Sequence, residues 1–236
     1  MRTMAGNKNG FPDAGPGTLQ HGMLVLVIGG AASGKSEYAE DLARSMYALS
    51  MAKDGGNQAA DVRIAESEEA RSGKQAAWNL SCPHRLWYIA TMHYDPADQE
   101  IAERIKKHRL QRAGKGFETI EIEQEIRRLT EMVKPGDTVL LEDLSNLLAN
   151  DLFPWEGEAI AQGEICGQIV QPLLEMNSKG IGIVVVGNRV SEDVHGEYDA
   201  GTEMFCNCFQ LLQRELGTAA DAVVEVVCGI PVCHGR

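Results

Sequence analysis

The chain contains a run of residues whose types and spacing suit the binding of a nucleoside triphosphate. The loop Gly29-Gly30-Ala31-Ala32-Ser33-Gly34-Lys35-Ser36 has the G-x-x-x-x-G-K-S form of a P-loop and follows an apolar segment. Its glycines let backbone N–H groups face a phosphate, Lys35 would reach the β- and γ-phosphate oxygens, and Ser36 would hold Mg²⁺. A helix predicted to begin at Lys35 adds its N-terminal dipole. The pattern therefore predicts nucleotide binding.

A second chemical feature is a pair of carboxylates that ends a later apolar segment. Glu142 and Asp143 directly follow residues 138–141. In parallel sheets, ligands gather at the carboxyl ends of the strands. Either carboxylate would hold Mg²⁺, directly or through water, or would act as a general base on an acceptor hydroxyl. The alternative is a polar residue that merely ends a strand, and the presence of the P-loop favours the metal role for one of the pair.

A basic cluster at 103–112 stands out in an otherwise acidic chain. Arg104, His108 and Arg112 follow one another at intervals of four residues, so they would share one face of a helix. One interpretation is a solvated, charged helix. The other is that the arginines, Arg109 included, hold phosphates while neutral His108 offers a ring nitrogen as nucleophile or proton carrier. Four other histidines stand in loop-like contexts, and we interpret them as solvent-exposed: His84, His93, His195 and His234.

Apolar runs alternate with helical stretches along the chain, which predicts parallel strands joined by crossover helices. The predicted strands are Leu24–Ile28, Leu86–Ala90, Thr138–Leu141, Ile181–Val186 and Ala222–Val227. The predicted helices are Lys35–Tyr47, Ala97–Arg112, Glu123–Val133, Gly157–Asn177 and Thr202–Leu216. We therefore expect a single α/β domain of the P-loop NTPase type, RecA-like, with a mostly parallel sheet flanked by helices.

Two segments differ in composition from this domain. Residues 1–22 are polar and contain glycine and proline, so we expect a disordered N-terminal extension before a domain at 23–236. Residues 50–85 are poor in large apolar side chains, and a structureless connection of that length is unusual in a compact domain. We interpret 50–85 as a flexible surface insertion.

Composition limits the partners and the compartment. The formal net charge of −12 argues against sequence-independent binding of nucleic acid. No apolar run approaches the roughly 18 residues that a membrane-spanning helix needs, so we expect no membrane insertion. The 6 cysteines occur in a chain long enough to fold without disulfides and without a secretion signal, which predicts reduced thiols and a cytoplasmic location.

Several motifs together resemble one enzyme family. The P-loop is followed by Tyr88-Ile89-Ala90-Thr91, then by the R-I-K-K-H-R stretch at 104–109, then by Leu140-Leu141-Glu142. This order is similar to that of bifunctional adenosylcobinamide kinase/adenosylcobinamide-phosphate guanylyltransferases, which act in cobalamin biosynthesis. The resemblance runs from about residue 23 to residue 229, with an interruption at the predicted insertion, and the combination is far more specific than any one motif.

The resemblance implies two reactions. ATP or GTP would phosphorylate the aminopropanol hydroxyl of adenosylcobinamide, with Lys35, Ser36 and Mg²⁺ neutralising the developing charge. His108 would attack the α-phosphate of GTP and expel pyrophosphate, and the cobinamide phosphate would then accept GMP to give adenosylcobinamide-GDP. The arginines that would clamp the triphosphate are Arg104, Arg109 and Arg112. The resemblance also implies a homo-oligomer.

The sequence departs from the family pattern after residue 188. The family tends to have N-E-V-G-x-G, whereas this chain reads Asn188-Arg189-Val190-Ser191-Glu192-Asp193, so that Arg189 replaces an acid. Phe205-Cys206-Asn207 replaces the family's F-R-D. Two other interpretations therefore stay open. One is a P-loop small-molecule kinase without guanylyltransferase activity, and the other is a degenerate nucleotide-binding module.

Overall fold

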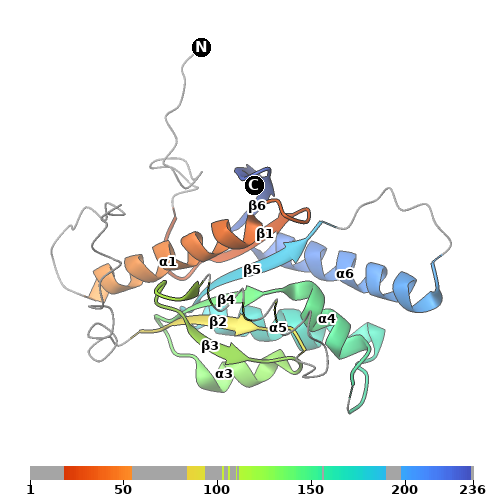
Figure 1. Cartoon of the computed structure of the whole chain (residues 1–236). Coiled ribbons are helices and arrows are strands. Elements are labelled where there is room, and N and C mark those ends of the chain that lie inside the picture. Colours follow the sequence, from red (N-terminus) through yellow and green to blue (C-terminus); the bar gives the residue numbers. More distant parts are fainter. Residues whose placement is uncertain are drawn as a thin grey trace.

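Seven strands form one sheet in the order β3-β2-β4-β5-β1-β6-β7 in the computed structural model of the chain (Figure 1). The structure describes residues 19–54, 84–93, 103, 106, 110, 112–155, 157–189 and 198–234. The strands are β1 (Leu24–Gly29), β2 (Leu86–Ala90), β3 (Glu118–Glu121), β4 (Thr138–Glu142), β5 (Gly182–Asn188), β6 (Ala222–Val227) and β7 (Ile230–His234). The helices are α1 (Lys35–Asp54), α3 (Leu129–Met132), α4 (Leu144–Leu152), α5 (Ile165–Ser178) and α6 (Ala200–Ala219), with 3-10 turns η3 (Ile126–Arg128) and η4 (Gln162–Glu164).

All strand pairs are parallel except β6 with β7, which is antiparallel. The predicted α/β fold with a mostly parallel sheet flanked by helices is therefore confirmed. β1, which leads into the P-loop, lies between β5 and β6, and β4, which leads into the carboxylate pair, lies beyond β5. The P-loop and the carboxylates consequently meet at one edge of the sheet, because parallel strands all end on the same side.

The side chains of the central strand, β1, alternate between two buried clusters, and this alternation explains how the layers of the fold assemble. Leu24 and Leu26 of β1 belong to one buried cluster, and Val25 and Val27 belong to the other. Side chains of a strand point alternately to the two faces of the sheet, so this strand is apolar on both sides. The first face packs against α4, α5 and α6, whereas α1 packs on the second (Figure 1). The sheet is thus covered on both faces.

Helix α1 is longer than predicted. It continues past Tyr47 to Asp54, and the Ser50 side chain is buried and donates a hydrogen bond of 2.7 Å to the Gly136 carbonyl. Residues 50–54, which were predicted to belong to the insertion, are therefore part of the helix. The buried Ser50 hydroxyl is satisfied there by the Gly136 carbonyl. The predicted insertion at 55–83 and the predicted extension at 1–18 lie outside the described residues.

Two other predicted helices begin later than expected. Gly157 has a φ of 90°, in the left-handed region, and α5 begins only at Ile165. Glu125 has a φ of 55°, so the helix predicted at 123–133 is reduced to η3 and α3. Left-handed backbone interrupts a right-handed helix in both cases. Of the helix predicted at 97–112, the described residues 103, 106, 110 and 112 have helical backbone.

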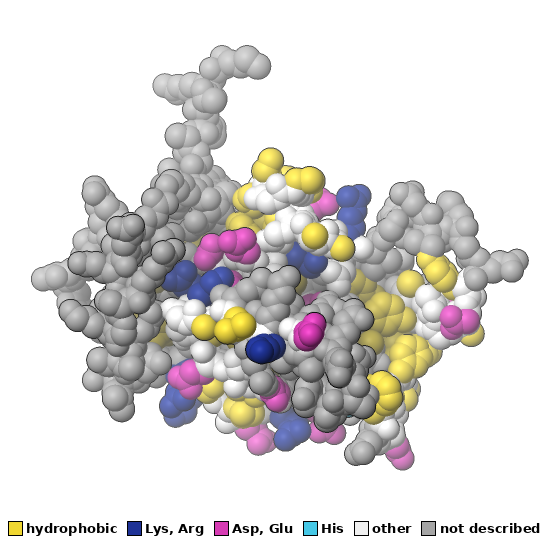
Figure 2. Space-filling model, viewed as in Figure 1, with side chains coloured by type: hydrophobic (Ala, Val, Ile, Leu, Met, Phe, Trp, Pro, Cys, Tyr) yellow, Lys and Arg dark blue, Asp and Glu magenta, His cyan; other side chains and the backbone are white. Residues whose placement is uncertain are grey.

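The surface over α4 and α6 carries a concentration of hydrophobic side chains (Figure 2). α6 is amphipathic, with Phe209, Leu212 and Leu216 buried against the sheet. Phe153, just after α4, stays partly exposed and lies beside Gly201 at the start of α6. Among the helices that the structure describes, none is both long enough and apolar enough to span a bilayer.

Asp151 on α4 gives the fold a pH-dependent weakness. Its side chain is only 2% exposed, and its Oδ1 atom has no hydrogen-bond partner. Burial raises the pKa of Asp151 to about 6, although a hydrogen bond from the Glu125 backbone opposes this rise. The folded protein therefore binds the proton more tightly than the unfolded chain does. Folding stability should be greatest below the unfolded pKa and should fall as the pH rises through about 6.

We expect Asp151→Asn to stabilise the protein strongly at pH 8 and much less at pH 4.5, which is close to the unfolded pKa of 3.8. The gain at pH 8 should be ~3 kcal/mol in the free energy of unfolding, because the pKa rises from 3.8 to about 6 and each pKa unit corresponds to about 1.4 kcal/mol. Urea denaturation at both pH values measures the free energy of unfolding, and Asp41→Asn, at an exposed position on α1, is the matched control. A stability difference that does not change with pH would contradict this account.

Candidate functional site

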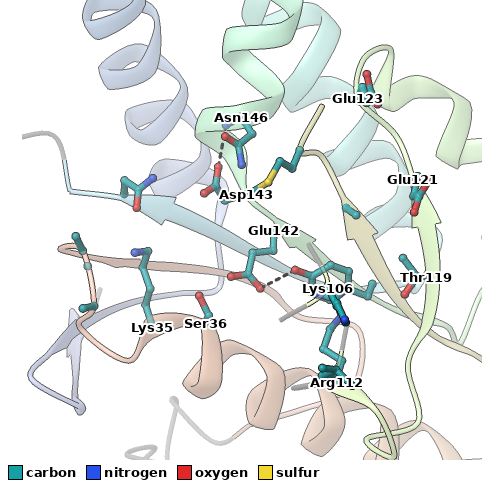
Figure 3. A pocket seen from close by; sticks show the side chains of 18 of the residues that line it. Lys35, Ser36, Lys106, Arg112, Thr119, Glu121, Glu123, Glu142, Asp143 and Asn146 are labelled. Atoms are coloured by element: carbon teal, nitrogen blue, oxygen red, sulfur yellow. Dashed lines mark hydrogen bonds between the residues drawn. The ribbon is translucent and has the colours of Figure 1, made fainter. Parts of the chain in front are cut away.

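A cavity of about 940 Å³ lies at the carboxyl edge of the sheet (Figure 3). It extends from the P-loop to the end of β3. Its lining comes from β1, β2, β3, β4 and β5, from the loops that follow them, from the starts of α1 and α4, and from the helical residues 106, 110 and 112. The lining residues are Gly29, Ala31, Ala32, Lys35, Ser36, Tyr88, Ala90, Met92, Lys106, Leu110, Arg112, Thr119, Glu121, Glu123, Glu142, Asp143, Asn146, Asn188 and Arg189. The residues predicted from two separate motifs therefore line the same cavity.

The P-loop lies between β1 and α1, in the strand-loop-helix context that the motif requires. Gly34 has a φ of 89°, which glycine adopts without strain. A Cβ atom on Gly29 would lie 2.8 Å from the Val226 carbonyl, so a larger residue would clash with β6. The Lys35 ammonium donates a hydrogen bond of 3.2 Å to the Gly30 carbonyl. The loop is also fixed from outside, because the Gly229 N–H donates to the Ser33 carbonyl at 2.8 Å.

Glu142 points from the end of β4 towards the P-loop helix. Its carboxylate accepts hydrogen bonds from the Ser36 and Tyr88 hydroxyls, at 3.2 Å from Tyr88. Figure 3 shows Ser36 and Glu142 facing each other, with Lys35 beside them. Burial raises the pKa of Glu142 above its usual value, and the two hydroxyls and Arg112 oppose this rise. A buried carboxylate next to a P-loop serine is suited to accept a proton or to contribute to a metal site.

Asp143 makes different contacts from Glu142 and caps a helix. Its Oδ1 accepts hydrogen bonds from the Asn146 N–H at 2.8 Å and from the Ser145 hydroxyl at 2.6 Å, so it is the N-cap of α4. An aspartate at this position satisfies N–H groups that the helix leaves unpaired. The Asp143 backbone exchanges hydrogen bonds with the Thr91 hydroxyl. Both predicted carboxylates line the cavity, but only Glu142 bonds to a P-loop side chain.

A chain of polar contacts behind Glu142 was missed by the sequence analysis. The Arg112 guanidinium stacks over the Tyr88 ring at 3.5 Å from its centroid, and Arg112 is only 8% exposed. Three residues later, Lys115 forms an ion pair with the buried Glu40 of α1. Burial raises the pKa of Glu40, and the contact with Lys115 opposes this rise. These contacts attach the segment after residue 110 to both β2 and α1.

Comparison with known proteins identifies the family. The model of the family described as "Cobinamide kinase / cobinamide phosphate guanyltransferase" matches residues 67–233. The chain belongs to this family. It is also 27% identical over 220 residues to the "Bifunctional adenosylcobalamin biosynthesis protein CobU" of Escherichia coli K12, a match that covers 89% of this chain and 98% of that protein. The family match begins after the P-loop, so the assignment of the P-loop rests on its sequence motif and its geometry.

Two solved structures are also similar over 89% of the chain, each at 14% sequence identity. One is the flagellar accessory protein FlaH from Methanocaldococcus jannaschii, with a TM-score of 0.41 and 73% of that chain covered. The other is the RadB recombinase, with a TM-score of 0.42 and 76% covered. Likeness at this level carries no argument about function.

The predicted site residues of this cobinamide kinase family member divide into two groups. The structure brings together Lys35, Ser36, Glu142, Asp143 and Arg112 around one cavity. His108, Arg104 and Arg109 lie outside the described residues, so their predicted roles stay predictions. Lys106 and Leu110, on either side of His108 in the sequence, line the cavity.

The far end of the cavity was not foreseen. Glu121 and Glu123 lie there, away from the P-loop (Figure 3). His93 is not simply solvated, because its Nδ1 hydrogen bonds to the Glu123 carboxylate and its ring stacks on Trp155 at a centroid distance of 5.1 Å. His234 lies in β7 and not in a loop. The contacts of His93 join residues that are far apart in the chain, so the sequence around each residue did not predict them.

The residues near the P-loop fit Mg²⁺ by their chemistry. Ser36 and Glu142 offer oxygen ligands, which this hard cation prefers. Within the described part of the chain, no group of three or more His, Cys, Asp or Glu side chains could enclose a metal. Mg²⁺ typically binds through one or two carboxylates together with water and substrate phosphates. The donor set therefore suits a cation that arrives with a nucleotide.

Proposed function

We propose that this chain phosphorylates adenosylcobinamide and then attaches GMP to the product in cobalamin biosynthesis. The observation that carries the proposal is that Lys35 and Ser36 of the P-loop share one cavity with Glu142, in a member of this family. The name of the Escherichia coli relative, a bifunctional adenosylcobalamin biosynthesis protein, supports the same function.

In the first reaction, the aminopropanol hydroxyl attacks the γ-phosphorus of ATP or GTP, and the nucleoside diphosphate leaves. Lys35 binds the phosphate oxygens and stabilises the charge that develops on them. The ionised Glu142 carboxylate takes the hydroxyl proton through one oxygen, and its other oxygen is left to help hold the cation. Mg²⁺, held by Ser36 and Glu142, would supply further neutralisation of the phosphates.

In the second reaction, a ring nitrogen of His108 attacks the α-phosphorus of GTP and expels pyrophosphate. A phosphate oxygen of the cobinamide phosphate then attacks the same phosphorus, releases His108 and yields adenosylcobinamide-GDP. A covalent intermediate divides one difficult displacement into two easier ones. His108 lies inside the family match, and Arg112, four residues later, lines the cavity and would help Arg104 and Arg109 to bind phosphates.

Intact-mass measurement after incubation with Mg²⁺ and GTP tests the proposal. We expect an acid-labile mass increase of one GMP in the wild type and none in His108→Ala. His93→Ala, a histidine beside the same cavity, should keep the adduct. Phosphate transfer from γ-labelled ATP to adenosylcobinamide is measured in parallel.

The outcomes separate the alternatives. Phosphate transfer without an adduct would indicate a small-molecule kinase that lacks the guanylyltransferase activity. Neither transfer nor adduct would indicate a degenerate nucleotide-binding module. Association of subunits and a cytoplasmic location stay predictions that follow from the family resemblance and the composition.

A further inference from the structure

Arg189 lines the cavity at its P-loop end. It directly follows β5, whose last residue, Asn188, is in register with Gly29 of β1. The Arg189 N–H donates a hydrogen bond of 3.0 Å to the Gly29 carbonyl. The Arg189 backbone is therefore hydrogen-bonded directly to the strand end that leads into the P-loop. Arg189 also lines the same cavity as Lys35.

The side chain of Arg189 reaches across the end of β1. Its Nη1 lies 3.4 Å from a carboxylate oxygen of Glu225, which is on β6 in register with Ile28. β1 lies between β5 and β6, so this ion pair spans the residues that precede the P-loop. The guanidinium is thus held close to the phosphate-binding loop, on the side of the strand away from β4.

The ion pair between Arg189 and Glu225 can be replaced by another contact of Arg189 at little cost in stability. The Arg189 side chain is 68% exposed, and the contact with Glu225 is single and long. Exposed ion pairs of this kind contribute little to stability. Glu225 is only 20% exposed, but its other oxygen lies 3.1 Å from His234 Nε2. It therefore keeps a polar partner when Arg189 turns away.

The other described cations of the cavity differ from Arg189 in exposure or in position. The described cationic residues that line it are Lys35, Lys106, Arg112 and Arg189. Arg112 is buried under its stack with Tyr88, and Lys35 bonds to the P-loop itself. A guanidinium offers several donors in a planar fork that matches phosphate oxygens. Arg189 is the exposed guanidinium among these cations, and its backbone lies at the strand end that leads into the P-loop.

We propose that Arg189 exchanges Glu225 for the terminal phosphate of a nucleoside triphosphate at the P-loop. It then acts as a binding residue that distinguishes triphosphate from diphosphate. The inference deepens the proposed function and rests on it, because it requires nucleotide at the P-loop.

Calorimetric titration with GDP and with a GTP analogue that resists hydrolysis tests the proposal. Arg189→Ala should weaken binding of the triphosphate by about tenfold or more, the scale of a charge-assisted hydrogen bond, and leave binding of GDP within about twofold. Arg189→Lys should fall between the wild type and Arg189→Ala. Arg214→Ala, an exposed arginine on α6 paired with Glu215, is the matched control and should bind both nucleotides normally.

Glu225→Gln separates a binding role from a structural one. Without the competing carboxylate, the triphosphate should bind at least as tightly as in the wild type. An equal loss for both nucleotides in Arg189→Ala, no loss for either, or a matching loss in Glu225→Gln would overturn the proposal. Wild-type protein that binds neither nucleotide would instead contradict the proposed function, and the inference with it.

Discussion

Lys35→Ala is expected to reduce phosphate transfer to adenosylcobinamide by about 10²- to 10³-fold, the cost of removing one preorganised group that stabilises transition-state charge. Lys35 is the first residue of α1, and its ammonium lies over the P-loop, within 3.2 Å of the Gly30 carbonyl. The charge is therefore fixed before the nucleotide arrives. Alanine keeps the helix start but leaves the phosphate charge unbalanced.

Initial rates with γ-labelled ATP measure this effect, and thermal unfolding shows whether the variant is folded. Lys53→Ala is the matched control, because Lys53 is an exposed lysine in the last turn of the same helix. It should retain the wild-type rate. A folded Lys35→Ala variant that loses less than about tenfold would remove the P-loop lysine from the mechanism.

The central part of the fold could be predicted from apolar runs, whereas the edges could not. β2 and β6 have the predicted bounds, because all their side chains are apolar except that of Glu225 in β6. β3 alternates between half-buried and exposed residues, and β7 is mostly exposed and contains Pro231. Edge strands bury too little to leave an apolar run in the sequence. α4 was missed because Asp143 was interpreted as a metal ligand, a general base or a polar residue that ends a strand, and not as a helix cap.

The chemical groups of the site could be predicted individually, but their connections could not. Motifs placed Lys35, Ser36 and Glu142 at one edge of the sheet. The contacts that hold Glu142 come from distant segments, since Tyr88 is 54 residues before it in the chain. Glu40 and Lys115 are 75 residues apart, and each resembles an ordinary surface charge in the sequence. Only the crossovers of the sheet bring such residues together.

Glu142→Gln is expected to lower the rate of phosphate transfer by about 10²- to 10³-fold, within the range for loss of a general base. Glutamine keeps the shape and can still accept the Ser36 and Tyr88 hydrogen bonds, but it carries no charge and takes no proton. Glu118→Gln is the control, because Glu118 pairs with Arg85 at the other end of β3 and does not line the cavity. A folded Glu142→Gln variant within tenfold of the wild type would exclude both roles of the carboxylate.

The pH dependence of the same reaction tests whether Glu142 acts as a carboxylate. Burial raises its pKa, so the wild-type rate should fall on the acidic side at a pH above the ordinary value of 4.5 as the group is protonated. The Tyr88 hydroxyl favours the ionised form, and Asp143 opposes it. Tyr88→Phe should therefore move the acidic limb to higher pH while leaving the plateau rate largely intact. An acidic limb that does not move in Tyr88→Phe would mean that another group controls it.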